Sequence, residues 1–164
     1  VLQSISLDKT KPLASVRAFN AYIQATAVNR ETGDLVAGGT ANIYGSRIPG
    51  SDPSQKLKTY QDDPTTLVRA FRAIDGSITH TYPGPGGSVQ GVSVSGDGRY
   101  VAASKARRLV SSPGYVLLWD AHSGQLLSAK DCGNSNVGDV AFDPNDMQLA
   151  YAIENKIYIS KLPR

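Results

Sequence analysis

Basic side chains in two long connecting segments are the clearest candidates for binding in this sequence. The segments cover residues 45–66 and 105–114, and both are much longer than a turn between two β-strands requires. Connections of this length are usually functional or disordered. Their lysines and arginines could attract an acidic partner, either an acidic peptide of a protein or RNA. The candidate partner-binding residues are Lys105, Arg107, Arg108, Arg47, Lys56 and Lys58.

The two segments differ in their charge balance. Segment 105–114 contains three cations and no acid, whereas the cations of segment 45–66 are balanced by Asp52, Asp62 and Asp63. A solvated basic loop without a partner explains the same residues, so both interpretations stay open. The whole chain has 17 Lys and Arg against 14 Asp and Glu, a net charge of +3, which argues only weakly for a polyanionic partner.

Residues with catalytic potential are few and scattered. The two histidines, His80 and His122, have no Ser or Cys beside them in a recognisable nucleophile motif. Cys, His and Asp nowhere have the spacing of a metal site, and residues 143–146 have the composition of a hairpin turn, not of a calcium loop. We therefore expect no catalytic residue, no cofactor and no metal, and we expect binding instead of catalysis.

Composition narrows the class of protein and its location. The 164 residues are 40% hydrophobic, which is enough for one domain with a core. The apolar runs are far shorter than the ~18 residues of a membrane span, so no membrane insertion is expected. Cys132 is the single cysteine and no Asn-x-Ser/Thr acceptor occurs, which favours a reducing compartment. We expect a cytoplasmic protein.

The elements that must position these residues repeat with a period of 48. VQGVSV at 89–94 corresponds to VGDVAF at 137–142, and VRAFRAIDGSI at 68–78 corresponds to VLLWDAHSGQL at 116–126. A period of about 20 to 50 residues is typical of architectures in which each unit buries its apolar face against its neighbours.

Each unit has the pattern of strands joined by turns rich in Gly, Asp, Asn and Pro. Three inner hairpins are predicted at 23–28 with 35–38, at 89–94 with 100–104, and at 137–142 with 149–153. Outer hairpins follow at 68–73 with 78–82 and at 115–120 with 126–129. The unit therefore has four strands, and the chain is predicted to be all-β.

These units resemble the blades of WD-repeat β-propellers. The resemblance rests on the dipeptide Trp119-Asp120, on the turn and strand that follow it at 123–127, and on the run 137–146. The aromatic that ends the third strand is expected to fill the wedge between two blades, and Phe71 has the equivalent position one unit earlier. The Gly-His pair that often opens such a blade is replaced by Gly86-Gly87-Ser88, so the blades are divergent.

The resemblance implies one propeller segment with an incomplete ring of about three blades. We expect a half blade at 1–19, a blade at 20–83 with the long loop 45–66, a blade at 88–131, and a blade at 136–164 that lacks its outer strand. Residues 1–19 could supply an outer strand. Because propellers close with about four to eight blades, we expect either a larger propeller of which this is a part, or several copies in one ring.

Two functions are compatible with this organisation. The first is a scaffold module that binds proteins within a larger assembly, with protein partners or further segments or copies completing the ring. The alternative is a fragment of a propeller enzyme or of a sugar-binding propeller, whose site would lie at the central channel.

Overall fold

The computed structural model describes residues 2–5, 12–16, 22–39, 66–85, 87–106, 113–145 and 148–162. For residues 2–5, 12–16, 66 and 67 only the course of the backbone is described. Across these ranges every long regular element is a β-strand, and no helix long and apolar enough to cross a membrane occurs in them. The prediction of an all-β chain is confirmed.

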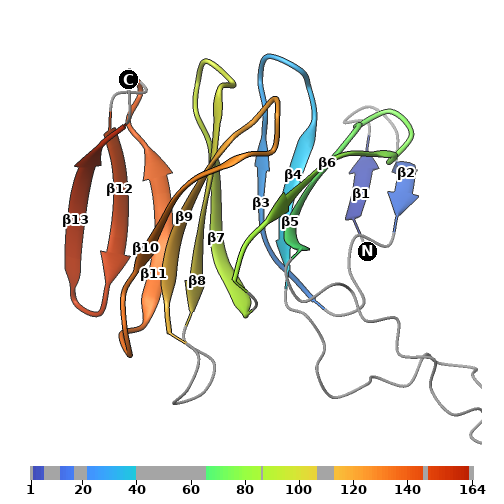
Figure 1. The fold of residues 1–164 in the computed structure, drawn as a ribbon. Coiled ribbons are helices and arrows are strands. Elements are labelled where there is room, and N and C mark those ends of the chain that lie inside the picture. Colours follow the sequence, from blue (N-terminus) through green and yellow to red (C-terminus); the bar gives the residue numbers. More distant parts are fainter. Residues whose placement is uncertain are drawn as a thin grey trace, which may run out of the picture.

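Two four-stranded antiparallel sheets form the centre of the chain (Figure 1). The first sheet contains, in this order, β3 (Ile23–Val28), β4 (Leu35–Gly39), β5 (Thr66–Phe71) and β6 (Ile78–Pro83). The second sheet contains, in this order, β7 (Ser88–Val94), β8 (Tyr100–Ala106), β9 (Tyr115–Asp120) and β10 (Leu126–Asp131). In both sheets each strand pairs with its neighbour in the sequence, as the repeat predicts.

A third sheet contains β11 (Val137–Phe142), β12 (Gln148–Ile153) and β13 (Lys156–Lys161), in that order. The remaining strands, β1 (Leu2–Ile5) and β2 (Pro12–Val16), pair with each other in a sheet of their own. In Figure 1 this hairpin lies at the opposite end of the row from β13. Within the chain, the N-terminal hairpin therefore does not supply the outer strand of the third sheet.

Turn chemistry explains where the strands reverse. In the turn between β7 and β8, the Tyr100 amide donates to Ser95 Oγ at 2.8 Å, and Gly98 adopts a φ of 70°, which favours glycine. In the turn between β9 and β10, Asp120 Oδ1 accepts hydrogen bonds from the Ser123 amide at 2.7 Å and from Ser123 Oγ at 2.8 Å. These side chains fix the two turns by local hydrogen bonds.

The three sheets pack face to face, with β7 between β3 and β11 (Figure 1). The core between the first and second sheets includes Val36, Val68, Tyr82, Val89, Val101, Leu117 and Trp119. The core between the second and third sheets includes Tyr100, Val116, Leu118, Val137, Val140, Leu149 and Tyr151. Because successive side chains of a strand point to opposite faces, β9 contributes alternate residues to both cores. Strands β8 and β9 are thus buried on both faces.

Candidate functional site

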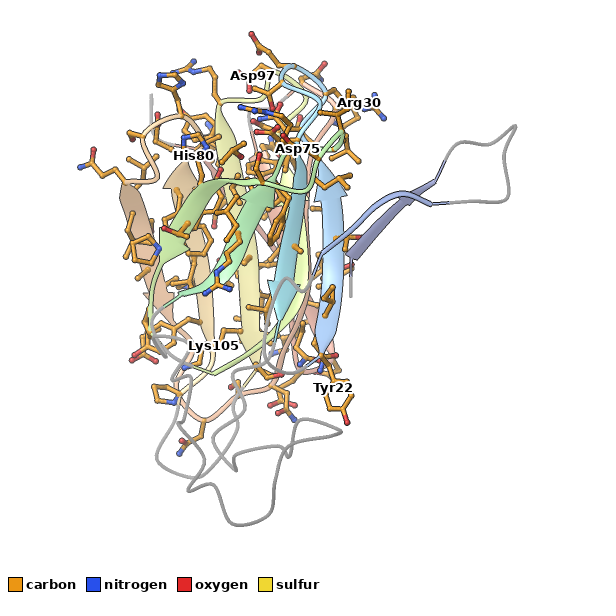
Figure 2. All side chains as sticks on the ribbon, turned by 90° about the vertical axis from the view of Figure 1, so that its right-hand side faces the viewer. Tyr22, Arg30, Asp75, His80, Asp97 and Lys105 are labelled. Carbon is orange, nitrogen blue, oxygen red and sulfur yellow. The ribbon has the colours of Figure 1, made fainter. Side chains whose placement is uncertain are left out.

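Lys105 does not lie in a connecting loop, which corrects the sequence analysis. Strand β8 extends to Ala106, and Lys105 pairs with Tyr115 across the β8-β9 ladder. Its side chain is only 2% exposed, at the lower end of the second sheet in Figure 2. Nζ donates to the Pro113 carbonyl oxygen at 3.2 Å and lies 4.9 Å from the centre of the Tyr115 ring. The ammonium group of Lys105 therefore makes its contacts within the chain.

Two neighbours explain how this lysine is accommodated. Gly87 leaves room for the stem of Lys105, since a Cβ at position 87 would collide with Lys105 Cε. Burial lowers the pKa of Lys105, and the Asp131 carboxylate acts in the opposite direction. The remaining basic candidates, Arg107, Arg108, Arg47, Lys56 and Lys58, lie outside the described residues, so their role in partner binding stays a prediction.

Trp119 fills the space between the first and second sheets, as predicted. Its side chain is fully buried, and its Nε1 donates to the Pro83 carbonyl oxygen at 2.7 Å. The indole lies 5.8 Å from the ring of Tyr82, whose hydroxyl donates to the Ala121 carbonyl oxygen at 3.1 Å. Aromatic packing and two hydrogen bonds thus join the two sheets. Phe71, one repeat earlier, is also fully buried.

A pocket of about 210 Å³ opens between the first and second sheets, and the sequence analysis did not predict it. Its described lining includes the apolar side chains of Val36, Ala70 and Ala121. Its polar lining comprises Asn29, Glu31, Thr32, Asp34, His80, Tyr82, Asp97, Arg99 and His122. Figure 2 shows His80 and Asp97 toward the end of the molecule opposite Lys105. The two histidines, which looked unrelated in the sequence, therefore share one cavity.

Hydrogen bonds fix much of the pocket wall. The Asn29 side chain is buried; it donates to the Gly98 carbonyl oxygen at 3.2 Å and accepts from the Glu31 amide at 3.0 Å. Asp34 Oδ2 accepts from Thr79 Oγ1 at 2.8 Å. Burial and the nearby Asp34 and Asp120 carboxylates raise the pKa of Tyr82 to about 12. Tyr82 is therefore a neutral hydrogen-bonding group at ordinary pH.

The outer face of the third sheet is apolar and open. Ile157 and Ile159 are 77% and 66% exposed, and both belong to β13. They pair with Ala152 and Ala150, so these four side chains share one face of the sheet. The corresponding residues of the second sheet are Val116 and Leu118. Ala150 lies 48 positions after Ala102, and Ile159 pairs with Ala150 as Leu118 pairs with Ala102.

Comparisons with known proteins identify the fold by structure and not by sequence. No known family profile matches the chain, and no curated protein matches it significantly. By structure, 477 chains of solved proteins match, so the fold is common and does not by itself identify a function. Two of them are described as the crystal structure of RRP9 WD40 repeats and the structure of U3-55K.

The likeness to these two structures covers most of this chain and a minor part of theirs. Both have a TM-score of 0.63 and 16% sequence identity over 89% of this chain. The chain spans only 37% and 38% of their lengths. An identity this low shows a common fold alone. The structural match and the four-stranded meanders together show that this chain has the fold of WD-repeat β-propeller blades, as the sequence analysis predicts.

Proposed function

We propose that this chain is a protein-interaction and scaffold segment of a larger WD-repeat-like propeller, in which a further blade covers the third sheet. The observation that carries the proposal is the contrast between two equivalent faces. Val116 and Leu118 of the second sheet are each 5% exposed because the third sheet covers them, whereas Ile157 and Ile159 are largely exposed. The third sheet thus presents the face that blades in this chain use to pack on one another.

The energy of burial supports this interpretation. Moving an isoleucine side chain from water into an apolar contact contributes about 1.5 to 3 kcal/mol. Two adjacent exposed isoleucines on a sheet face, flanked by Ala150 and Ala152, form the kind of patch that marks an interaction surface. The matching cover within the chain consists of Val137, Val140, Leu149 and Tyr151, which is the chemistry we expect of the covering blade.

The covering blade is proposed to come from the same longer polypeptide. The solved WD40 structures that match this chain are between two and three times as long as the part it spans, which supports a propeller with more blades than the three described. A second copy of this chain is the alternative occupant, and the experiment below separates the two.

Substitution of the open face tests the proposal in the full-length protein. The double variant Ile157→Asp/Ile159→Asp should lower the midpoint of thermal unfolding strongly, because two charges would be buried against apolar residues. Leu127→Asp is the matched control, since Leu127 is also exposed but lies on β10, the largely exposed outer strand of the second sheet, and not on the open face of the third sheet. Equal effects of both variants would contradict the proposal. A native mass of two or more chains that falls to one in the double variant would assign the cover to a second copy.

The basic segments form a second part of the proposed interaction role. Arg107 and Arg108 are proposed to attract an acidic partner. Lys105 is left out of this proposal because its side chain is buried. Arg107→Ala/Arg108→Ala should slow association and flatten its salt dependence, with little change in stability. Unchanged association rates for captured partners would leave these arginines as solvated loop residues.

A further inference from the structure

We propose that the pocket between the first and second sheets binds a basic side chain, arginine or lysine, of a protein partner. The inference rests on the proposed protein-interaction function but concerns a different surface from the open face of the third sheet. It follows from the volume of the pocket, the chemistry of its floor and the charge of its rim.

The size and floor of the pocket fit a long side chain with a polar end. Its volume of about 210 Å³ is several times the ~30 Å³ that one water molecule takes up in the liquid. Val36, Ala70 and Ala121 offer apolar surface for methylene groups. The rings of His80 and Tyr82 lie stacked with centroids 6.2 Å apart, and they supply aromatic surface for a cation.

The rim of the pocket has an excess of negative charge. Among the described lining residues, Glu31, Asp34 and Asp97 carry carboxylates and Arg99 carries a guanidinium. The Arg99 guanidinium lies 5.3 Å from the centre of the Tyr100 ring, which belongs to the core on the other side of the second sheet. A cationic side chain is therefore the complement of this rim, and a phosphate or carboxylate is not.

The Asp97 carboxylate and the turn that carries Glu31 are held in place before any partner binds. Asp97 Oδ1 accepts from Ser95 Oγ at 2.7 Å and from the Arg99 amide at 3.0 Å. Asn29 ties the turn that carries Glu31 to the turn that carries Asp97 through its bond to the Gly98 carbonyl. A site that is already arranged loses little conformational freedom on binding, which favours affinity.

A metal ion fits the site less well than a side chain. Within the part of the chain that the structure describes, no three His, Cys, Asp or Glu side chains are grouped to hold a metal. The carboxylates surround an open cavity with an apolar floor, and a metal ion would leave that floor unused.

Peptide binding to the full-length protein tests the inference. The probe is acetyl-Gly-Arg-Gly amide, and the matched control is the same peptide with citrulline, which has the shape of arginine without its charge. We expect amide chemical-shift changes around Glu31, Asp97 and Ala121 with the arginine peptide only. Affinity should fall when salt is raised from about 0.05 M to about 0.5 M, because the attraction is partly exposed to solvent.

Two variants assign the binding to this pocket. Glu31→Gln/Asp97→Asn keeps the acceptor oxygens of both turns, and it should weaken binding about fivefold or more by removing two charges. Glu154→Gln, a carboxylate in the β12-β13 turn at the other end of the molecule, should leave binding unchanged (Figure 1). Thr32→Arg should block the pocket with a tethered guanidinium, in case the double variant perturbs the turns.

The results that would overturn the inference are distinct from those that concern ring completion. Equal binding of the arginine and citrulline peptides, or equal loss in the double variant and in Glu154→Gln, would contradict it. So would binding of a uridine oligonucleotide that competes with the peptide. Because none of these variants touches Ile157 or Ile159, an intact unfolding midpoint with no peptide binding would reject the pocket and leave the propeller assignment standing.

Discussion

The Nε1 of Trp119 donates a hydrogen bond of 2.7 Å to the carbonyl oxygen of Pro83. The bond connects the third strand of the second sheet with the last residue of β6, where the chain leaves the first sheet. Since the Trp119 side chain is fully buried, water cannot easily replace the acceptor of its indole N–H. The tryptophan therefore contributes both an apolar wedge and a directional bond at the boundary between two blades.

Substitution of Trp119 should separate these two contributions. Trp119→Ala should lower the free energy of unfolding by about 3 to 5 kcal/mol, because it leaves a large cavity. Trp119→Phe, which places in the second sheet the residue found at position 71, should cost about 1 to 3 kcal/mol, because it removes buried ring volume together with the hydrogen bond to Pro83. Urea unfolding monitored by circular dichroism measures both. A phenylalanine variant as stable as the wild type would show that the hydrogen bond contributes nothing.

Lys105 should behave as a buried packing residue. Lys105→Ala should cost about 2 kcal/mol or more, because it removes a stem packed beside Gly87 and Tyr115. Lys105→Met fills the same space without a charge and should differ from the wild type by less than about 1.5 kcal/mol. Equal stabilities for the alanine variant and the wild type would mean that the side chain is solvated after all.

The lowered pKa of Lys105 also predicts a pH dependence. Between the lowered pKa of Lys105 in the folded chain and the ordinary lysine pKa of 10.5, the unfolded chain binds more protons at this residue than the folded chain. Stability therefore rises with pH across that interval, and the wild type should gain relative to Lys105→Met as the pH approaches 10.5. A constant difference between the two proteins over the alkaline range would contradict the burial of the charge.

Ser104 should be replaceable by alanine without loss. Its Oγ is buried and has no hydrogen-bond partner in the described structure, and Ala152 has the equivalent position one repeat later. Ser104→Ala should be neutral or stabilising by up to about 1 kcal/mol. Ser93→Ala is the matched control, because Ser93 Oγ accepts from the Phe142 amide at 3.3 Å and its loss should destabilise. Thermal unfolding measures both variants, and a Ser104→Ala variant less stable than Ser93→Ala would contradict the prediction.

Asp120 should contribute to the acid sensitivity of the fold. Hydrogen bonds from the Ser123 amide and hydroxyl, and from the His122 amide, hold the pKa of Asp120 below its ordinary 3.8. The stabilisation is therefore present above pH 3.8 and is lost as the pH falls through the folded-state value. Asp120→Asn should unfold with a shallower dependence on pH below about 4. Parallel acid-unfolding curves would contradict this role.

The repeat predicts the fold well because one period sets both the strands and their buried faces. A shift of 48 residues carries Trp119 onto Phe71, and the structure buries both completely. The same shift carries Ala102 onto Ala150. Their paired residues, Leu118 and Ile159, therefore have equivalent positions in the two sheets. Strand pairing in a meander is local, so it can be predicted from turn residues and alternation.

The sites are harder to predict because they depend on contacts between sheets. The charge of Lys105 alone indicates a solvated loop. Its burial depends on contacts with Gly87, which precedes β7, and with Tyr115, which follows a long connection, and no local pattern relates these residues. The pocket joins turns around Asn29, Asp97 and His122, which no local pattern relates. The recurrence of acids in successive turns is the one signal that could have indicated it.

The accessibility of position 159 in the full-length protein tests the central claim most directly. A cysteine is introduced as Ile159→Cys in a Cys132→Ser background, with Leu127→Cys as the control, and the rate of maleimide labelling is measured under native conditions. If a further blade covers the third sheet, Ile159→Cys should react more than about tenfold more slowly than Leu127→Cys, a protection of about 1.4 kcal/mol, and equally fast in urea. Equal labelling rates in the native protein would show that this face is open and would contradict the proposed propeller.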